Sequence, residues 1–323
     1  MNQKKITELE QVIRQGYQNT AGIIVLKNGQ ILYETYFNDC TEENPIHVFS
    51  VTKSILSILI GIALDRGEIE CVDQNILAFL PNYVVKKDKT SIQRVKIREL
   101  LTMTAPFNYQ EEPYIDYFMS SNYSEFALDL LGKSESGGTF RYTPLVGPDI
   151  LSGILVNAAG KSVLDYAKEY LFSPLGITVE KNLIFQNQEE QMAFYASRTI
   201  SGWVSDAAGI NTAGWGLTLT LQDLAKIGQL YLNEGKWGNK QIVSSRWVEE
   251  STQKHSYWKE AGLSYGYLWW VLSDSVFAAM GDGGDILYVD TKEKTVIALT
   301  GLFEQKTGDR IELIEKYVKP MIE

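Results

Sequence analysis

The chain has 323 residues and an ordinary globular composition, with 45% hydrophobic and 22% charged residues, so it can bury a large core. Its formal net charge of −10 argues against nucleic acid and against anionic membrane surfaces as partners. The two cysteines, Cys40 and Cys71, and the two histidines, His47 and His255, have no metal-ligand spacing, so we expect no metal site.

The first predicted element is a helix, because apolar residues recur at helical spacing between residues 3 and 15 and Gly16 follows as a stop. This segment has no apolar core like that of a signal peptide, so we expect a cytoplasmic chain. Residues 21–26 and 31–37 predict two strands of a hairpin, joined by a turn at 27–30.

The apolar run at 55–64 predicts a helix that is buried on nearly all sides, with Ser50 in or beside its first turn. Ser50 and Lys53 are three residues apart and therefore share one face. A serine hydroxyl needs a base to act as a nucleophile, and a buried lysine whose pKa falls toward neutrality can serve. The alternative is that Ser50 only caps the helix. A second Ser-x-x-Lys copy at Ser251 lacks the buried helix.

The middle of the chain predicts mainly helices and the end mainly strands. Helices are expected at 95–103, 123–131, 149–159, 163–172 and 220–232, a loop-rich stretch at 180–216, strands at 265–272, 276–280, 286–290 and 295–302, and a closing helix at 309–321. This order predicts one α/β (α+β) unit over residues 1–323, with an antiparallel sheet from both termini, flanking helices and an inserted helical region. We place an α/β subdomain at 1–47 plus 244–323 and a helical subdomain at 48–243.

Two further segments are candidates for a site. Tyr142 follows a loop at 134–139 that contains two glycines, and loops held by rigid elements often carry catalytic groups. The run from Gly281 to Asp285 joins two predicted strands, either as a simple turn or as a strand edge that approaches a ligand closely. The G-x-S-x-G pattern at 262–266 is rejected, because strand-like sequence follows it and no histidine lies beyond His255. A serine paired with His47 or His255 remains an alternative.

The segments that carry a family resemblance are 49–69, 95–105, 213–237, 265–271 and 281–290, together with the loop of Tyr142. In this order they resemble the serine β-lactamase and penicillin-binding-protein superfamily. The nearest branch is the class C β-lactamase-like serine hydrolases, which include esterases, amidases and D-amino-acid peptidases.

The resemblance implies a role for each matching residue. Ser50 would be the nucleophile, Lys53 its base, and Tyr142, in the position of a Tyr-x-Asn motif, would assist proton transfer. The substrate-binding strand edge, Lys-Thr-Gly-like in the family, would be Asp282, Gly283 and Gly284. The backbone N–H groups of Ser50 and Asp285 would form the oxyanion hole.

Two departures from the family pattern concern the substrate. Pro144 stands where the family usually has an asparagine, and Asp282 replaces a basic residue or histidine that commonly receives a substrate carboxylate. Two like charges about 4 Å apart repel by about 4 kcal/mol at an effective dielectric near 20. We therefore expect neutral or cationic substrates to be preferred over carboxylates, and penicillins to be poor substrates.

The sequence thus predicts a serine hydrolase that cleaves an ester or amide bond of a small molecule or short peptide through an acyl-enzyme, without a cofactor. The alternatives are a β-lactamase, a D-alanyl carboxypeptidase, or a binding or sensor protein that kept the fold without turnover. Neither a nucleic-acid nor a membrane partner is expected, and the sequence makes no prediction of the oligomeric state.

Overall fold

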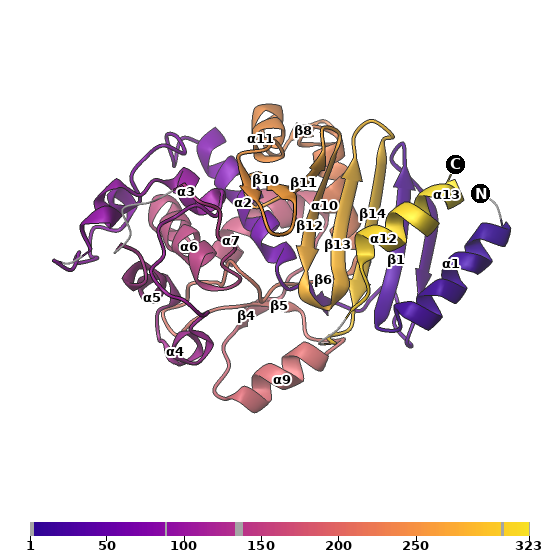
Figure 1. The fold of residues 1–323 in the computed structure, drawn as a ribbon, viewed down its shortest axis with the longest axis horizontal. Coiled ribbons are helices and arrows are strands. Elements are labelled where there is room, and N and C mark those ends of the chain that lie inside the picture. Colours follow the sequence, from indigo (N-terminus) through magenta and orange to yellow (C-terminus); the bar gives the residue numbers. More distant parts are fainter. Residues whose placement is uncertain (1–2, 88, 133–137, 305–306, 323) are drawn as a thin grey trace.

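The computed structural model describes residues 3–87, 89–132, 138–304 and 307–322. In these ranges the main sheet is antiparallel, with eight strands in the order β2-β1-β14-β13-β12-β11-β10-β9. The strands are β1 (Thr20–Lys27), β2 (Gln30–Tyr36), β9 (Ser256–Trp258), β10 (Leu263–Tyr265), β11 (Trp270–Ser273), β12 (Val276–Gly281), β13 (Asp285–Asp290) and β14 (Thr295–Gly301). Since β1 pairs with β14, the predicted sheet built from both termini is confirmed (Figure 1).

Helices pack on both faces of this sheet. They are α1 (Gln3–Gly16), α2 (Val51–Asp65), α3 (Ile97–Leu101), α4 (Tyr114–Met119), α5 (Tyr123–Asp129), α6 (Val146–Ala159), α7 (Val163–Ala167), α8 (Ser173–Leu175), α9 (Gln188–Ala196), α10 (Leu221–Leu232), α11 (Ser245–Ser251), α12 (Arg310–Leu313) and α13 (Lys319–Ile322). None of the helices in the described ranges is long and apolar enough to cross a bilayer.

Three pairs of short strands lie outside the main sheet. They are β3 (Ile46–His47) with β6 (Thr218–Leu219), β4 (Lys181–Leu183) with β5 (Gly202–Val204), and β7 (Lys236–Trp237) with β8 (Lys240–Gln241). The β3–β6 pair matters for the site, because β3 leads directly into the turn that carries Ser50.

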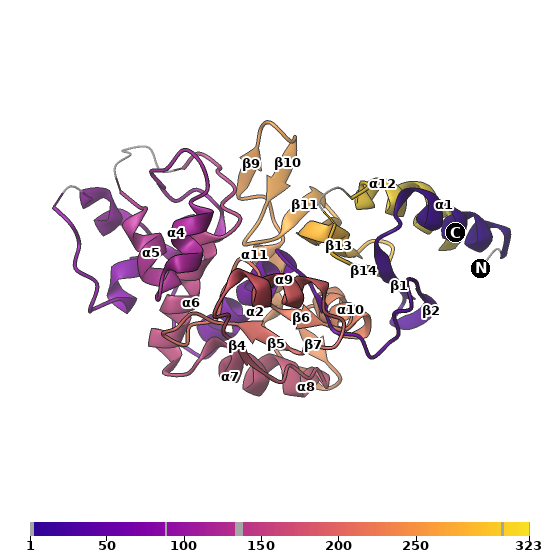
Figure 2. The same cartoon turned by 90° about the horizontal axis from the view of Figure 1, so that it is seen from below.

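The two faces of the sheet are covered by different helices, as alternation along a strand requires. On β1, Ile23 and Val25 pack with Leu9 of α1 and with α12 and α13. Ile24, on the opposite face, belongs to the core that includes α2 and α10. Figure 2 shows α1 and α12 at one end of the molecule and α4, α5 and α6 toward the other.

Helix α2 is the central element of the larger core. Thirteen of its residues, from Val51 to Ala63, are buried, as expected for a helix that is apolar nearly all round. The helix contacts β12 and β13 on one side and α6 on another. At Gly61 the indole of Trp247 from α11 approaches so closely that an added Cβ would lie 2.2 Å from its Cδ1 atom.

Two predicted elements differ from the structure. The expected strand at 265–272 is interrupted, because residues 266–269 form a connection in which Leu268 has a φ of 60° and its carbonyl accepts a 2.6 Å hydrogen bond from Ser54 Oγ. The stretch at 180–216, expected to be loop-rich, contains α9, whose N-cap Asn187 accepts a hydrogen bond from the N–H of Glu190. Helix α10 lies within the predicted helical subdomain, yet it packs on β1, β13 and β14 of the main sheet. The predicted subdomain boundaries therefore stay a prediction.

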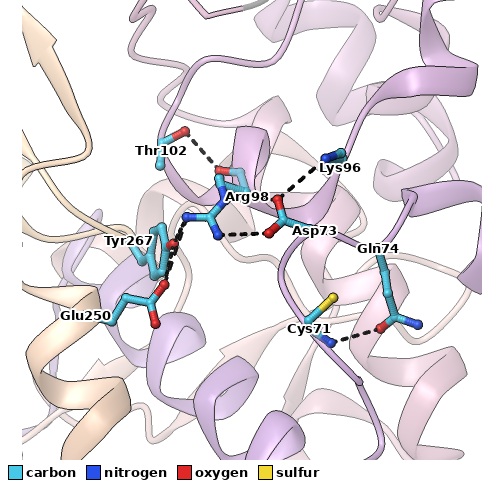
Figure 3. A network of polar contacts seen from close by, with 8 residues as sticks. All are labelled: Cys71, Asp73, Gln74, Lys96, Arg98, Thr102, Glu250 and Tyr267. Atoms are coloured by element: carbon cyan, nitrogen blue, oxygen red, sulfur yellow. Dashed lines mark hydrogen bonds and ion pairs between the residues drawn. The ribbon is translucent and has the colours of Figure 1, made fainter.

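A polar network fastens the helical region to the segment between β10 and β11 (Figure 3). Arg98 of α3 donates two 3.1 Å hydrogen bonds to the carboxylate of Asp73 and a further bond to the hydroxyl of Tyr267. The Tyr267 hydroxyl in turn donates to Glu250 of α11 at 2.9 Å. Because these groups are partly exposed, solvent screens the ion pair, and the network fixes orientation more than it adds stability.

We predict that Gly61→Ala lowers the free energy of unfolding by about 1–3 kcal/mol, because the added methyl group overpacks against Trp247. Helix propensity alone would instead favour alanine by about 1 kcal/mol. The sign of the change in the free energy of unfolding therefore shows whether overpacking or helix propensity dominates. Urea unfolding measures it.

The matched control is Gly16→Ala, at the end of α1, where an added Cβ would have no neighbour within 4 Å. Its stability should be unchanged or slightly raised. Equal gains in both variants would show that the Gly61–Trp247 contact does not constrain α2.

Candidate active site

Ser50 lies immediately before α2, half-buried, and its side chain makes no capping hydrogen bond to the helix. Its Oγ instead accepts a 2.9 Å hydrogen bond from Nζ of Lys53. The three-residue spacing thus brings the two side chains together, and the alternative in which Ser50 serves only as a cap is not what the structure shows.

The amine of Lys53 is withdrawn from water, with 1% of the residue exposed. Besides Ser50, Nζ donates to the carbonyl of Pro144 at 2.7 Å and to that of Gly214 at 2.8 Å. Burial lowers the pKa of Lys53 to about 7, and the more distant carboxylates of Asp282, Asp149 and Glu112 oppose that shift. No hydrogen bond joins Nζ to a carboxylate in the described part of the chain.

These three acceptors determine how a neutral Lys53 is oriented. A protonated amine has three N–H donors for the three oxygens, whereas a neutral amine has two donors and one lone pair. Carbonyl oxygens can only accept, so the two remaining N–H groups belong to Pro144 and Gly214. The lone pair is then directed at Ser50 Oγ, whose hydroxyl can reverse its role and donate.

Tyr142 is the third predicted catalytic residue, and the structure brings it to the same place. Lys53 Nζ lies 5.2 Å from the centroid of its ring. Burial raises the pKa of Tyr142, while hydrogen bonding from the Ser50 side chain acts against the rise, so the phenol is protonated at neutral pH. Its ring packs beside those of Trp258 and Trp270. Most of the loop that precedes it, residues 133–137, lies outside the described residues.

The strand edge predicted near Asp282 approaches Ser50 through Gly281. A Cβ at Gly281 would lie 2.4 Å from the carbonyl oxygen of Val48 and 3.3 Å from the backbone nitrogen of Ser50, so only glycine permits this contact. The Ser50 N–H has no acceptor among the described residues. Asp282, the next residue, is exposed and lines the cavity in front of Ser50.

The placement of Asp285 differs from the sequence-based expectation. Asp285 is 1% exposed, pairs with Gly281 across β12 and β13, and accepts a 3.0 Å hydrogen bond from the N–H of Gly301. Gly283 and Gly284 are also buried and do not line the cavity. Of this run, Gly281 is the residue whose backbone approaches Ser50, and Asp282 is the residue that lines the cavity, because the chain turns away from the cavity after Asp282.

This turn is supported from beneath. Asn19 Nδ2 donates to the carbonyl of Gly283 at 2.6 Å, and the Asn19 Oδ1 atom accepts from Arg310 at 2.7 Å. The Arg310 side chain also fills the space beside Gly284, where an added Cβ would lie 2.4 Å from Nε. Residues from both ends of the chain thus hold the strand edge in position.

The cavity in front of Ser50 has a volume of about 850 Å³ and is mainly aromatic and apolar. Asp282 carries the only charge among the described residues that line it. The other lining residues are Phe49, Ser50, Tyr114, Ile115, Phe118, Met119, Tyr123, Pro144, Leu145, Phe185, Gln186, Asn187, Gln188, Gln191, Met192, Tyr195, Gly214, Trp215 and Phe303. A larger hollow of about 1170 Å³ elsewhere, beside α10 and α11, contains neither Ser50 nor Lys53.

A buried carboxyl that the sequence did not single out supports one wall of this cavity. Asp149 of α6 accepts hydrogen bonds from the N–H of Ala213 at 2.7 Å and from the hydroxyl of Tyr117 at 2.6 Å. The indole N–H of Trp215 donates to the same hydroxyl at 3.2 Å. Burial raises the pKa of Asp149 to about 7. The network anchors residues 213–215, and so positions the Gly214 carbonyl that binds Lys53.

The other candidates from the sequence are two histidines and Ser251, and each of them is hydrogen-bonded to a backbone group. His47 is buried, its Nε2 accepts from the N–H of Gly216 at 2.9 Å, and burial lowers its pKa to about 3. His255 Nε2 contacts the Glu250 carbonyl at 2.8 Å. Ser251 is buried at the end of α11 and bonds to Val248. Across the described ranges, no three His, Cys, Asp or Glu side chains gather in a way that could hold a metal.

The chain is similar to known proteins along most of its length. The family model described as Beta-lactamase matches residues 9–314. A 6-aminohexanoate-dimer hydrolase of Paenarthrobacter ureafaciens is 22% identical over 91% of this chain and 74% of its own length. The octameric penicillin-binding protein homologue from Pyrococcus abyssi superposes with a TM-score of 0.73 at 20% identity, over 98% of this chain and 77% of its own. A D-stereospecific amidohydrolase from Streptomyces sp. gives a TM-score of 0.71 at 14% identity, over 98% of both chains. At these identities, the solved structures show a shared fold.

We predict that Asp149→Ala lowers the free energy of unfolding by about 2–5 kcal/mol, because it leaves the buried N–H of Ala213 and the hydroxyl of Tyr117 without their acceptor. Denaturant unfolding measures the loss. Asp116→Ala, an exposed change on the neighbouring helix α4, should stay within about 0.5 kcal/mol. Equal losses of stability in the two variants would show that Asp149 does not anchor residues 213–215.

Proposed function

Since the chain belongs to the β-lactamase family, we propose that it is a serine hydrolase that cleaves an ester or amide bond of a small molecule through an acyl-enzyme on Ser50. The observation that carries the proposal is the hydrogen-bonding of Lys53. A lysine with a pKa near 7, held by two carbonyls so that its lone pair faces a serine hydroxyl, meets the requirements of a general base.

The proposed first step is acylation. Lys53 takes the proton of Ser50 as Oγ attacks the substrate carbonyl carbon, and the carbonyl oxygen becomes an oxyanion. The N–H of Ser50, which has no other described acceptor, stabilises this charge. The second donor that we propose is the N–H of Asp282, because Gly281 places that backbone against Ser50.

The proposed release of the first product uses Tyr142. Its phenol, protonated because burial raises its pKa, donates to the leaving oxygen or nitrogen as the scissile bond breaks, and the proton on Lys53 restores the phenol. In the second half, Lys53 removes a proton from water as the water attacks the acyl carbon, and then returns that proton to Ser50 Oγ, which leaves as the hydroxyl. The free acid and the regenerated serine balance the reaction without a cofactor.

The cavity favours esters and amides without a carboxylate near the scissile bond. None of the described lining residues is basic, and Asp282 repels a carboxylate. This argues against β-lactams and against peptides with a C-terminal D-alanine as preferred substrates. The names of two similar proteins, a 6-aminohexanoate-dimer hydrolase and a D-stereospecific amidohydrolase, support including amides.

The alternative of a binding or sensor protein is motivated by Pro144 and Asp282, which depart from the family pattern. The structure offers a reason to favour catalysis. Pro144 contributes its carbonyl to Lys53, a contact that does not require an asparagine side chain.

We predict that a fluorophosphonate probe labels the protein once, at Ser50, and that Ser50→Ala abolishes both the labelling and p-nitrophenyl ester hydrolysis. The reason is that Ser50 is the serine whose hydroxyl contacts a buried lysine. Peptide mass spectrometry of the labelled protein identifies the site, and circular dichroism checks that the variant is folded.

The control is Ser251→Ala, in the second Ser-x-x-Lys copy, where the hydroxyl is buried against Val248. It should keep both labelling and turnover. Undiminished turnover in Ser50→Ala would refute the proposed mechanism, and labelling of Ser50 without any ester or amide turnover would favour the binding or sensor alternative.

We predict that kcat/KM for an uncharged ester rises with pH and levels off above about 7, because Lys53 acts only in its neutral form. Tyr142→Phe should keep this midpoint while losing about 10²–10⁴-fold in kcat/KM, the range for one general acid–base group. The two pH–rate profiles measure both effects. A flat profile around neutrality would exclude Lys53 as the titrating base, and unchanged kcat/KM in Tyr142→Phe would make the tyrosine structural.

A further inference from the structure

Three aromatic side chains from distant parts of the sequence form one wall of the cavity. Phe49 precedes Ser50, Tyr195 comes from α9, and Phe303 follows β14. Their ring centroids lie 5.3–5.5 Å apart in all three pairs. We call this group the aromatic wall. Behind it, the ring of His47 stacks on Tyr195 at 5.2 Å, and burial lowers the pKa of His47 to about 3, so it is neutral.

Asp282 adds a negative charge to the same part of the cavity. It lines the cavity together with the aromatic wall, and the pKa of Tyr195 is raised mainly by burial and further by the charge of Asp282. No hydrogen bond or ion pair joins its carboxylate to another described residue, and the residue is exposed. The preceding residue, Gly281, lies so near Ser50 that an added Cβ would be 3.3 Å from the Ser50 backbone nitrogen. The carboxylate is therefore close to the bond that would be cleaved.

We propose that Asp282, Phe49, Tyr195 and Phe303 form a subsite for an ammonium group of the substrate, next to the scissile ester or amide bond. The inference rests on the proposed function, and it narrows the substrate class to esters or amides that carry a protonated or quaternary amine. The carboxylate supplies charge, and the aromatic faces attract a cation through their quadrupoles.

An apolar substrate group alone explains the wall but not the carboxylate. An apolar pocket would gain nothing from an unpaired aspartate, whereas recognition of an ammonium group uses both features. A metal ion is a poorer occupant, because a single carboxylate is flanked here by aromatic rings and the described residues contain no ligand cluster.

The position of Asp282 gives an ammonium group a second effect. A carboxylate beside the oxyanion hole opposes the negative charge that develops during acylation. The charge of Asp282 also opposes the loss of a proton from Lys53. A bound ammonium group offsets the carboxylate, so both unfavourable interactions weaken when a cationic substrate is present. Preference for such a substrate should thus appear in kcat as well as in KM.

The test compares substrates that differ only in charge, with trimethylammonium exchanged for the isosteric tert-butyl group. Butyrylcholine and 3,3-dimethylbutyl butyrate place the group on the leaving alcohol. The p-nitrophenyl esters of 4-(trimethylammonio)butanoate and 5,5-dimethylhexanoate place it on the acyl chain. For one of the two pairs, we expect kcat/KM to favour the cation by about threefold or more, given the modest strength of partly exposed cation–π contacts and ion pairs.

Two variants test the residues themselves. The measured quantity is the ratio of kcat/KM for the cationic substrate to kcat/KM for its neutral isostere. Asp282→Asn should bring this ratio close to one. Phe303→Leu, which keeps apolar bulk but removes the aromatic face, should lower it partly. The matched control is Asp274→Asn, an exposed aspartate in the turn between β11 and β12 that does not line this cavity. It should leave the ratio unchanged.

The subsite is refuted if the wild-type ratio is one or lower for both pairs, or if Asp282→Asn and Asp274→Asn have the same effect. If neither esters nor amides are hydrolysed, the proposed function fails, and binding of butyltrimethylammonium to Ser50→Ala decides the subsite separately by calorimetry. Binding that weakens at least threefold in Ser50→Ala/Asp282→Asn supports it, and binding that does not weaken refutes it.

Discussion

The arrangement of the active site follows from one constraint, the removal of the Lys53 amine from water. Burial disfavours the charged form, and the neutral amine needs acceptors for its two N–H groups. Two backbone carbonyls, of Pro144 and Gly214, provide them. The start of α6 and the segment before β6 must therefore pack tightly against α2. The buried Asp149 network meets this requirement by tying α6 to residue 213.

The sheet built from both termini brings the other half of the site to the same place. Asp282 and Phe303 follow β12 and β14, Phe49 follows β3, and Tyr195 comes from the helical region. The Asn19–Arg310 contact then supports the turn at Gly283 from behind. The cavity wall that faces Ser50 is thus assembled by tertiary structure, with no local motif of its own.

The sequence predicted local features well and the long-range parts of the site poorly. Helix α2 and the Ser50–Lys53 contact follow from apolar periodicity and a three-residue spacing, which act within one turn. Helix α9 was missed because its nine residues have no clear apolar periodicity, although Asn187 and Glu190 carry a capping signal.

Other parts of the site carry no signal in side-chain identity. The acceptors at Pro144 and Gly214 are backbone carbonyls, so no pattern of residue types predicts that they bind Lys53. The oxyanion-hole expectation for Asp285 came from the family resemblance, which does not fix the residue at which this strand turns away from the cavity. Gly281 is the residue that the close approach to Ser50 requires to be glycine. In the sequence it cannot be distinguished from Gly283 and Gly284, which lie in the same run.

Phe49 holds a left-handed backbone conformation, with a φ of 44°, immediately before the nucleophile. Such a conformation costs a bulky residue roughly 1–3 kcal/mol, and glycine would adopt it without strain. Yet its ring contacts both Tyr195 and Phe303. Burial of this ring, which is 7% exposed, contributes about 1.5–3 kcal/mol and so offsets the strain of the backbone. The side chain at position 49 therefore links the conformation of the backbone before the nucleophile to the shape of the substrate cavity.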